Sequence, residues 1–230
     1  MEEALFWAAV AASSLVIGGL LGVARHWPDE GVGLVLAFGA GALISAVSFD
    51  LAEEGADIGG AGYVAIGLAG GAITYFVASR QLDRRSTGGG TDLALGALLD
   101  GIPEQMVLGI GIATGDGVGV GLLIAIFVSN LPEAIGGSDD LRAAGHSPGA
   151  VRRTWLAIAA VCTLAGVAGY AIADAVSGDF QAVINGFAAG ALLVMLVDSM
   201  IPEAREKAGA PAGLMSVLGF AVAAGLSGLS

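Results

Sequence analysis

Six acidic side chains lie inside long apolar stretches of this 230-residue chain. They are Asp50, Asp100, Glu104, Glu133, Asp198 and Glu203. No Lys or Arg lies at a similar depth in those stretches to neutralise them. Because buried carboxylates close together repel one another, each would need a proton or a cation. The acids therefore predict a site that binds a metal cation.

Three of these acids belong to a recurring triplet in which an apolar residue is followed by Pro and Glu. The triplets are 102–104, 131–133 and 201–203. A proline inside a helix kinks it and frees the carbonyl four residues back, here at Leu99, Val128 and Asp198. In lipid those carbonyls need another partner. Kinked helices that offer carbonyls beside carboxylates predict an oxygen-rich site for a hard cation.

The spacing of the polar residues agrees with such a site. Asp100 and Glu104 are four residues apart and share one helix face, and Asn130 and Glu133 are three apart and share another. If the two faces meet, three carboxylates and an amide surround one cavity. The alternative is that these polar residues only hold helices together or line a packed kink.

The composition shows what kind of elements must position these residues. Hydrophobic residues make up 56% of the chain and charged residues 13%, against the ~25% charged residues of a soluble domain. The 39 glycines occur within apolar runs, which is typical of helices packed closely in lipid. A net charge of −12 excludes a general nucleic-acid binder. The single cysteine, Cys162, excludes a disulfide framework and a cysteine-based metal cluster.

About twenty apolar residues cross a bilayer, and the chain contains eight such runs. They lie at about 4–24, 34–52, 60–79, 93–113, 118–137, 154–173, 182–203 and 212–229. The breaks between them are short. We therefore expect an all-α integral membrane protein of eight transmembrane helices that forms one domain over 1–230.

The basic residues indicate the orientation of the chain in the membrane. All nine lie in the connections after the first, third, fifth and seventh spans: Arg25; Arg80, Arg84 and Arg85; Arg142, Arg152 and Arg153; Arg205 and Lys207. Because Lys and Arg concentrate in cytoplasmic loops, these connections are expected inside and both termini outside. The outer face is then acidic, and an acidic path leads from it to a weakly basic inner face.

An internal repeat relates the second and seventh spans. Residues 38–43 resemble residues 187–192 at an offset of 149. The same offset brings Asp50 beside Asp198 and Ser199, and Glu54 onto Glu203. The two spans would cross the membrane in opposite directions, which predicts an inverted repeat. The first three and last three spans would be its halves, around a central pair formed by the fourth and fifth.

These features resemble the ZIP (Zrt/Irt-like) family of divalent metal transporters over nearly the whole chain. The family's fourth span carries His-Asn-x-Pro-Glu-Gly, where residues 100–105 read Asp-Gly-Ile-Pro-Glu-Gln. Its fifth span carries a similar motif, where residues 129–134 read Ser-Asn-Leu-Pro-Glu-Ala. The glycine-rich approach to an acidic residue before Pro-Glu in the seventh span resembles residues 186–203.

The resemblance implies a site and a function. Asp100, Glu104, Asn130 and Glu133 would be ligands of the central metal site, and either Asp198 or Ser199 would add the contribution of the seventh span. The chain would carry divalent cations of the Zn, Mn, Fe or Cd class across the plasma membrane into the cytoplasm. The cation would be the substrate, with no cofactor and no enzymatic activity. A homodimer in the lipid bilayer is the usual state of the family.

The chain departs from the family where the histidines stand. Asp100 and Ser129 replace them, and Gly101 replaces the asparagine of the fourth span. The two histidines of the chain, His26 and His146, fall in cytoplasmic connections, where we expect solvated loop residues. An all-oxygen site favours Mg, Ca or Mn and tolerates Fe(II), although Zn and Cd also bind carboxylates.

Three other functions compete with transport. The first is a ZIP-like protein that binds metal as a sensor or scaffold without transport. The second is an intramembrane aspartyl protease, whose Gly-x-Gly-Asp motif has its nearest counterpart at 113–116, without the first glycine. A zinc protease motif His-Glu-x-x-His is absent from the sequence. The third is a carrier coupled to protons or anions on another helical fold.

Overall fold

The computed structural model describes residues 1–85, 90–113, 119–176 and 178–227, and every regular element in these ranges is a helix. The protease-like string at 113–116 thus lies largely outside the described residues. The elements are α1 (Glu2–Ala24), α2 (Asp29–Ala46), η1 (Val47–Glu53), α3 (Glu54–Gly59), α4 (Ala61–Arg85), α5 (Gly90–Ala113), α6 (Val120–Ala143), α7 (Pro148–Asp174), α8 (Asp179–Met195), η2 (Leu196–Met200), α9 (Ile201–Ala208) and α10 (Pro211–Ser227).

The expected spans appear as helices close to the predicted positions. Two pass through a π-helical turn without a break: α2, η1 and α3 form one run over Asp29–Gly59, and α8, η2 and α9 form another over Asp179–Ala208. In the described ranges, seven helices are long and apolar enough to cross a membrane. The eighth expected span corresponds to α10, which is shorter at 17 described residues. The chain is therefore an all-α, multi-pass membrane protein.

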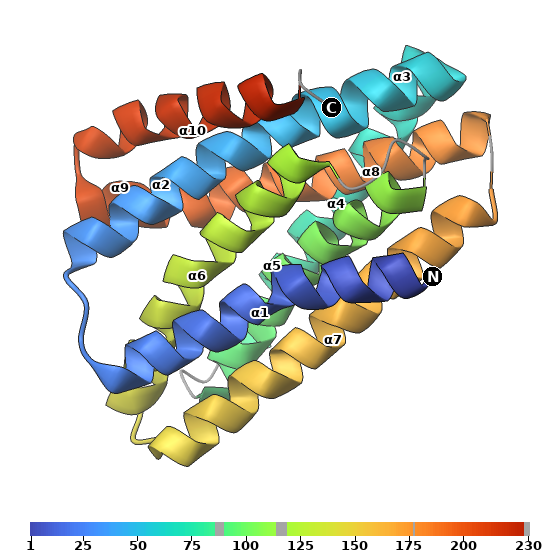
Figure 1. Cartoon of the computed structure of the whole chain (residues 1–230). Coiled ribbons are helices and arrows are strands. Elements are labelled where there is room, and N and C mark those ends of the chain that lie inside the picture. Colours follow the sequence, from blue (N-terminus) through green and yellow to red (C-terminus); the bar gives the residue numbers. More distant parts are fainter. Residues whose placement is uncertain (86–89, 114–118, 177, 228–230) are drawn as a thin grey trace.

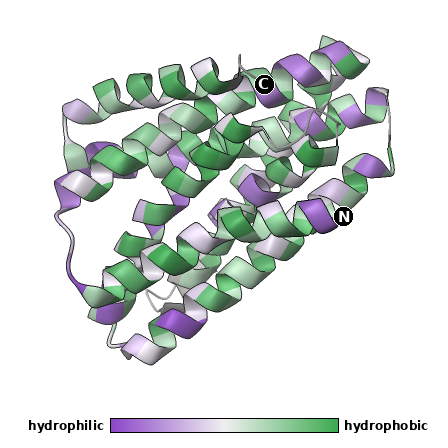
Figure 2. Cartoon of the chain, viewed as in Figure 1, coloured by the Kyte–Doolittle hydropathy of each residue, from purple (hydrophilic) through white to green (hydrophobic). Residues whose placement is uncertain are grey.

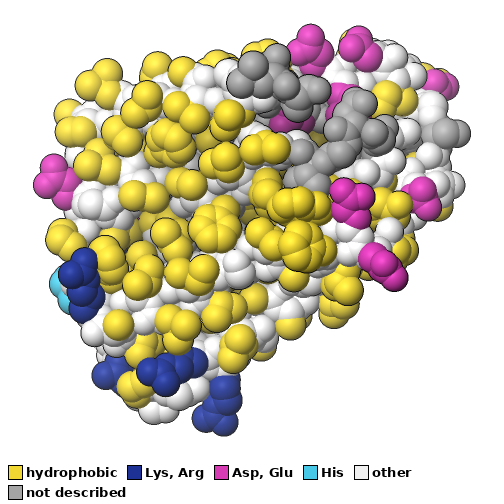
Figure 3. Space-filling view, in the orientation of Figure 1, with side chains coloured by type: hydrophobic (Ala, Val, Ile, Leu, Met, Phe, Trp, Pro, Cys, Tyr) yellow, Lys and Arg dark blue, Asp and Glu magenta, His cyan; other side chains and the backbone are white. Residues whose placement is uncertain are grey.

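Successive helices run back and forth along the bundle (Figure 1). The run through α2 ends at the end of the bundle where α3 lies, and the run through α8 ends at the opposite end, with α9. Apolar residues cover the middle of the visible helices, and hydrophilic residues concentrate toward both ends (Figure 2). On the face shown in Figure 3, Lys and Arg gather at one end and most of the visible Asp and Glu at the other.

Glycines set how closely the helices approach. The most extensive contacts pair α2 with α10, α4 with α8, α1 with α6, and α5 with α7. A methyl group on Gly71 of α4 would lie 1.8 Å from the Phe187 carbonyl oxygen, and one on Gly109 of α5 would lie 1.9 Å from that of Gly166. No side chain fits there unless the backbones separate. Small residues thus allow backbone-to-backbone packing, as expected for helices in lipid.

The internal repeat is visible in the packing. Gly41 and Gly190, 149 residues apart, each face a carbonyl of the third helix of the opposite half: Ser216 in α10 and Leu68 in α4. The π-helices η1 and η2 also fall at matching positions in the two halves. Of η1 and η2, only η2 is followed by a proline, Pro202, so proline alone does not explain the π-helical turns.

The packing of α4 against α8 can be tested with a matched pair of substitutions. A methyl group on Gly67 would lie 2.0 Å from the Val183 carbonyl oxygen, whereas one on Gly62 of the same helix meets nothing within 4 Å. We expect Gly67→Ala to destabilise the protein by about 1–3 kcal/mol through overpacking. Gly62→Ala should not, because alanine favours a helix over glycine by about 0.5–1 kcal/mol. Thermal unfolding of both variants in detergent checks this, and an equal effect would contradict it.

Candidate functional site

The candidate site lies where α5 and α6 carry their prolines. Pro103 and Pro132 each lie inside a helix that continues past them. Glu104 of α5 and Asn130 of α6 are fully buried. Asp100 of α5 and Glu133 of α6 are partly buried. The acids on the two helices lie close enough to interact electrostatically, and Glu133 interacts in this way with both Asp100 and Glu104.

Several polar atoms at this point lack a partner. The Ser129 hydroxyl lies 3.3 Å from Glu104 Oε1, but it also donates to the Ile126 carbonyl at 3.0 Å. Glu104 Oε2 and both amide atoms of Asn130 are buried without a hydrogen-bond partner in the described structure. Unpartnered buried acceptors are costly. Carboxylate and amide oxygens facing no donor fit a hard cation or water.

The acids do not form a closed coordination sphere. Within the described ranges, no group of three or more His, Cys, Asp or Glu side chains is arranged to hold one metal ion. A metal at this point would therefore depend on amide, hydroxyl or water oxygens as well as carboxylates. Whether Asp100, Glu104, Asn130 and Glu133 coordinate a metal stays a prediction.

Asp100 has partners on two neighbouring elements. The Tyr75 hydroxyl of α4 donates to Asp100 Oδ1 in a short hydrogen bond. The Ser199 hydroxyl of η2 donates to Asp100 Oδ2 over 3.5 Å, which is long for such a bond. Both carboxylate oxygens of Asp100 thus face hydroxyl groups that come from outside α5 and α6.

This arrangement separates the two residues that the sequence left as alternatives in the seventh span. Ser199 faces Asp100, whereas Asp198 is exposed and has no such contact in the described structure. Both residues line a cavity of about 410 Å³ that extends from Tyr75 and Asp100 to Arg80 and Asp83. The cavity therefore opens toward the basic end of α4, the end at which the expected cytoplasmic connections lie.

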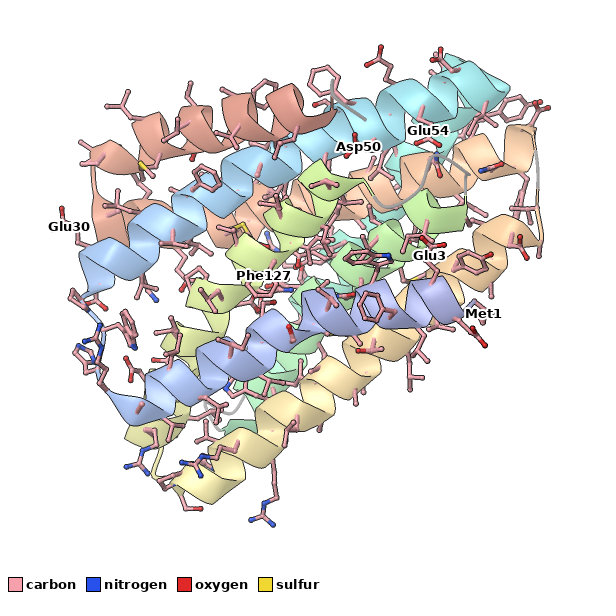
Figure 4. All side chains as sticks on the ribbon, viewed as in Figure 1. Met1, Glu3, Glu30, Asp50, Glu54 and Phe127 are labelled. Carbon is pink, nitrogen blue, oxygen red and sulfur yellow. The ribbon has the colours of Figure 1, made fainter. Side chains whose placement is uncertain are left out.

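Acids also mark the opposite end of the bundle. Asp50 and Glu54 lie toward the same end as Met1 and Glu3, whereas Glu30 lies at the other end (Figure 4). A methyl group on Gly119, just before α6, would lie 4.0 Å from Asp50 Oδ2. Asp50 therefore stands beside the start of the helix that carries Asn130 and Glu133, but it is not part of the Asp100 cluster.

The remaining acid of the triplets, Glu203, continues the acidic series toward the basic end. It acts electrostatically on both Asp100 and Glu133. Its own carboxylate pairs with Lys207, with 2.8 Å between Glu203 Oε1 and Lys207 Nζ. Glu203 thus connects the candidate site to the surface at α9.

The histidines lie away from the site, as expected. His26 is 77% exposed in its side chain and pairs with Asp139, with 3.0 Å between Nδ1 and Oδ2. His146 is exposed in the connection before α7. The structure also gives a reason for Gly101, which replaces an asparagine of the resembled motif. A methyl group there would lie 2.8 Å from Cys162 Sγ, so a side chain at this position requires the Cys162 side chain to move.

Sequence reasoning missed Tyr75. A tyrosine in an apolar run resembles a packing residue, whereas the acids in the spans stand out by their charge. The signal available was a phenol near the inner end of its span, followed by Ser79 and Arg80. Nothing in the sequence placed it opposite Asp100, because that contact depends on how α4 and α5 cross.

The two central helices, α5 and α6, share a proline–glutamate pair but differ at the polar position three residues before the proline. At an offset of 29, Pro103 and Glu104 of α5 correspond to Pro132 and Glu133 of α6, while Asp100 corresponds to Ser129. At the offset of 149, Ser199 of η2 corresponds to Asp50 of η1. In the central pair and in the two halves, an acid of one helix thus matches a serine of the other.

Comparison with known proteins finds one informative similarity. The chain is 29% identical over 238 residues to an Arabidopsis thaliana protein named "Putative zinc transporter". The alignment covers 96% of this chain but 37% of that protein, so the chain spans little more than a third of the relative's length. No protein-family model matches the sequence.

The cost of burying Glu104 can be measured without any metal. Because Glu104 Oε2 has no partner in the described structure, we expect Glu104→Gln to stabilise the metal-free protein by about 1 kcal/mol at pH 8. Thermal unfolding in detergent with a chelator present tests this. Glu206→Gln, at an exposed position of α9, is the control and should change little. A lower unfolding temperature for Glu104→Gln would show that the carboxylate is already satisfied.

Proposed function

We propose that this chain is a ZIP-like carrier that moves divalent metal cations across the membrane into the cytoplasm. The main support is the acidic cluster of α5 and α6 inside a multi-pass membrane bundle, with buried oxygens that lack donors. Similarity to a protein named as a zinc transporter supports the same class of substrate. Asp100, Glu104, Asn130 and Glu133 are the proposed ligands, with Ser199 as the contribution of η2.

The proposed route begins at the acidic end. Glu53 and Asp57 are exposed and Glu54 is partly buried, so they can attract a cation. The cation then passes Asp50 and reaches the ligands at the centre. Release occurs into the cavity beside Asp100 that leads past Asp198 to Asp83. A shift of α4 and α8 relative to α5, across the boundary that contains the cavities, would expose the ligands to one side at a time.

The ligand chemistry favours cations that accept oxygen donors. The proposed ligand set contains no imidazole or thiolate, and the buried Cys162 packs against Gly101. Mn²⁺ and Fe²⁺ suit carboxylate and amide oxygens, and Zn²⁺ and Cd²⁺ also bind carboxylates. We therefore propose a divalent transition-metal substrate without restricting it to zinc.

One observation favours the alternative of a metal-binding protein without transport. The described residues form no compact cluster of three classical ligands, so a weak binding site that senses metal is the second candidate. The two functions differ in whether bound metal crosses the membrane.

Uptake into reconstituted vesicles separates these functions. We expect the protein to carry at least one of Mn²⁺, Fe²⁺, Zn²⁺ and Cd²⁺. Replacing either proposed ligand, as in Glu104→Ala or Glu133→Ala, should reduce uptake by more than about tenfold. Glu206→Ala, which alters an exposed acid of α9, is the matched control and should keep full uptake.

Unchanged uptake in both ligand variants would contradict the proposed site. Binding of metal without uptake by the unaltered protein would instead support the sensor or scaffold.

The proposed orientation can be tested separately in intact cells. Cys162 is fully buried and is the single cysteine of the chain, so Cys162→Ala provides a cysteine-free background. In it, Asp57→Cys should react with a membrane-impermeant maleimide from outside. His146→Cys should react only after the membrane is made permeable. The reverse pattern would place both termini inside.

A further inference from the structure

The contact between α5 and the pair α4 and α8 differs from the contact between α6 and α2. Where α6 meets α2, Gly39 lies directly against the backbone of Ser129. Between α5 and the α4–α8 pair there are instead two cavities. One is the polar cavity of about 410 Å³, and the other is an apolar cavity of about 230 Å³ lined by residues such as Met106 and Phe187.

Tyr75 stands between these two cavities. It lines both of them, and it is 5% exposed. Its hydroxyl points to the polar side, where it donates to Asp100 Oδ1. Ser199 adds a second, longer contact to Asp100 Oδ2 from η2. Hydroxyl groups of α4 and η2 therefore form hydrogen bonds to a proposed metal ligand of α5, across a boundary that contains cavities.

The strength of this bridge must depend on whether Asp100 holds a cation. A hydrogen bond to an ionised carboxylate is roughly twice as strong as one between neutral groups. A divalent cation on the same carboxylate neutralises its charge and so weakens the bond from the hydroxyl. Tyr75 therefore stabilises the empty carboxylate more than the metal-bound one. Because Tyr75 stabilises the empty carboxylate, it lowers the affinity of Asp100 for metal in the conformation in which the polar cavity opens toward the basic end of α4.

We propose that Tyr75 is a positioning residue for metal release. Its hydroxyl, assisted by Ser199, forms a hydrogen bond with Asp100 as the cation leaves, and this contact keeps the polar cavity open. This rests on the proposed function, because it assigns a role to the same site. The phenol supplies the hydrogen bond that an emptied carboxylate needs, at a boundary that contains two cavities.

The first test measures metal affinity. We expect Tyr75→Phe in the purified full-length chain to bind Mn²⁺ or Zn²⁺ up to about tenfold more tightly by calorimetry. Its maximal uptake rate in vesicles should fall, because release is slower, while the concentration for half-maximal uptake falls with it.

Tyr63→Phe is the matched control. Tyr63 lies on the same helix, and its hydroxyl also lies near an aspartate, Asp179, but at the far end from the cavity. It should leave affinity and rate unchanged. Weaker metal binding by Tyr75→Phe would overturn the proposal, because it would show that the phenol orients Asp100 for capture. Unchanged binding would overturn it as well.

A second test needs no metal and so distinguishes a failure of this proposal from a failure of the proposed function. Ser79 lines the polar cavity. In the Cys162→Ala background with a chelator present, Ser79→Cys should react readily with a water-soluble maleimide. Adding Tyr75→Phe should slow the reaction severalfold, because the cavity closes more often. An unchanged reaction rate would contradict the role of Tyr75 even if the chain carries metal. A slower reaction in a protein that carries no metal would contradict only the proposed function.

Discussion

The low dielectric of the bilayer is the constraint on which this structure depends. A carboxylate there must be neutralised or solvated, and the structure records no ion pair to Asp100, Glu104 or Glu133 in the part of the chain that it describes. The rest of the architecture keeps these acids together. Backbone contact at glycines holds the helices in fixed pairs, and a cavity of about 410 Å³ lies beside Asp100.

Helix packing is close within certain pairs and looser along one boundary of α5. The pairs α5 with α7 and α1 with α6 are joined backbone to backbone, and Trp155 of α7 donates to the Ser138 hydroxyl of α6 at 2.8 Å. Helices α4 and α8 form an equally close pair of their own. The boundary between these groups along α5 is held by polar contacts and contains cavities. Rigid units separated by a soft boundary can shift without unfolding.

Much of this was accessible from the sequence, for physical reasons. Hydropathy and the positions of the arginines predicted the helices because lipid demands long apolar helices. The recurring Pro-Glu triplets predicted that α5 and α6 carry the site, and the acids of these two helices lie within electrostatic range of one another. The choice between Asp198 and Ser199 was beyond the sequence. Both lie on the π-helix η2, where the angle between successive side chains departs from the α-helical value on which face assignments rely. Tyr75 was also missed, because its role depends on a crossing between helices.

The exchange of acids and serines between the two halves has a consequence of its own. The two halves share a glycine contact and a π-helix at matching positions, but their charged residues differ. Asp50 and Ser199 occupy equivalent places, as do Ser129 and Asp100. A frame with matching positions in its two halves thus carries an electrical polarity. The two ends of the bundle are inequivalent from the covalent structure alone.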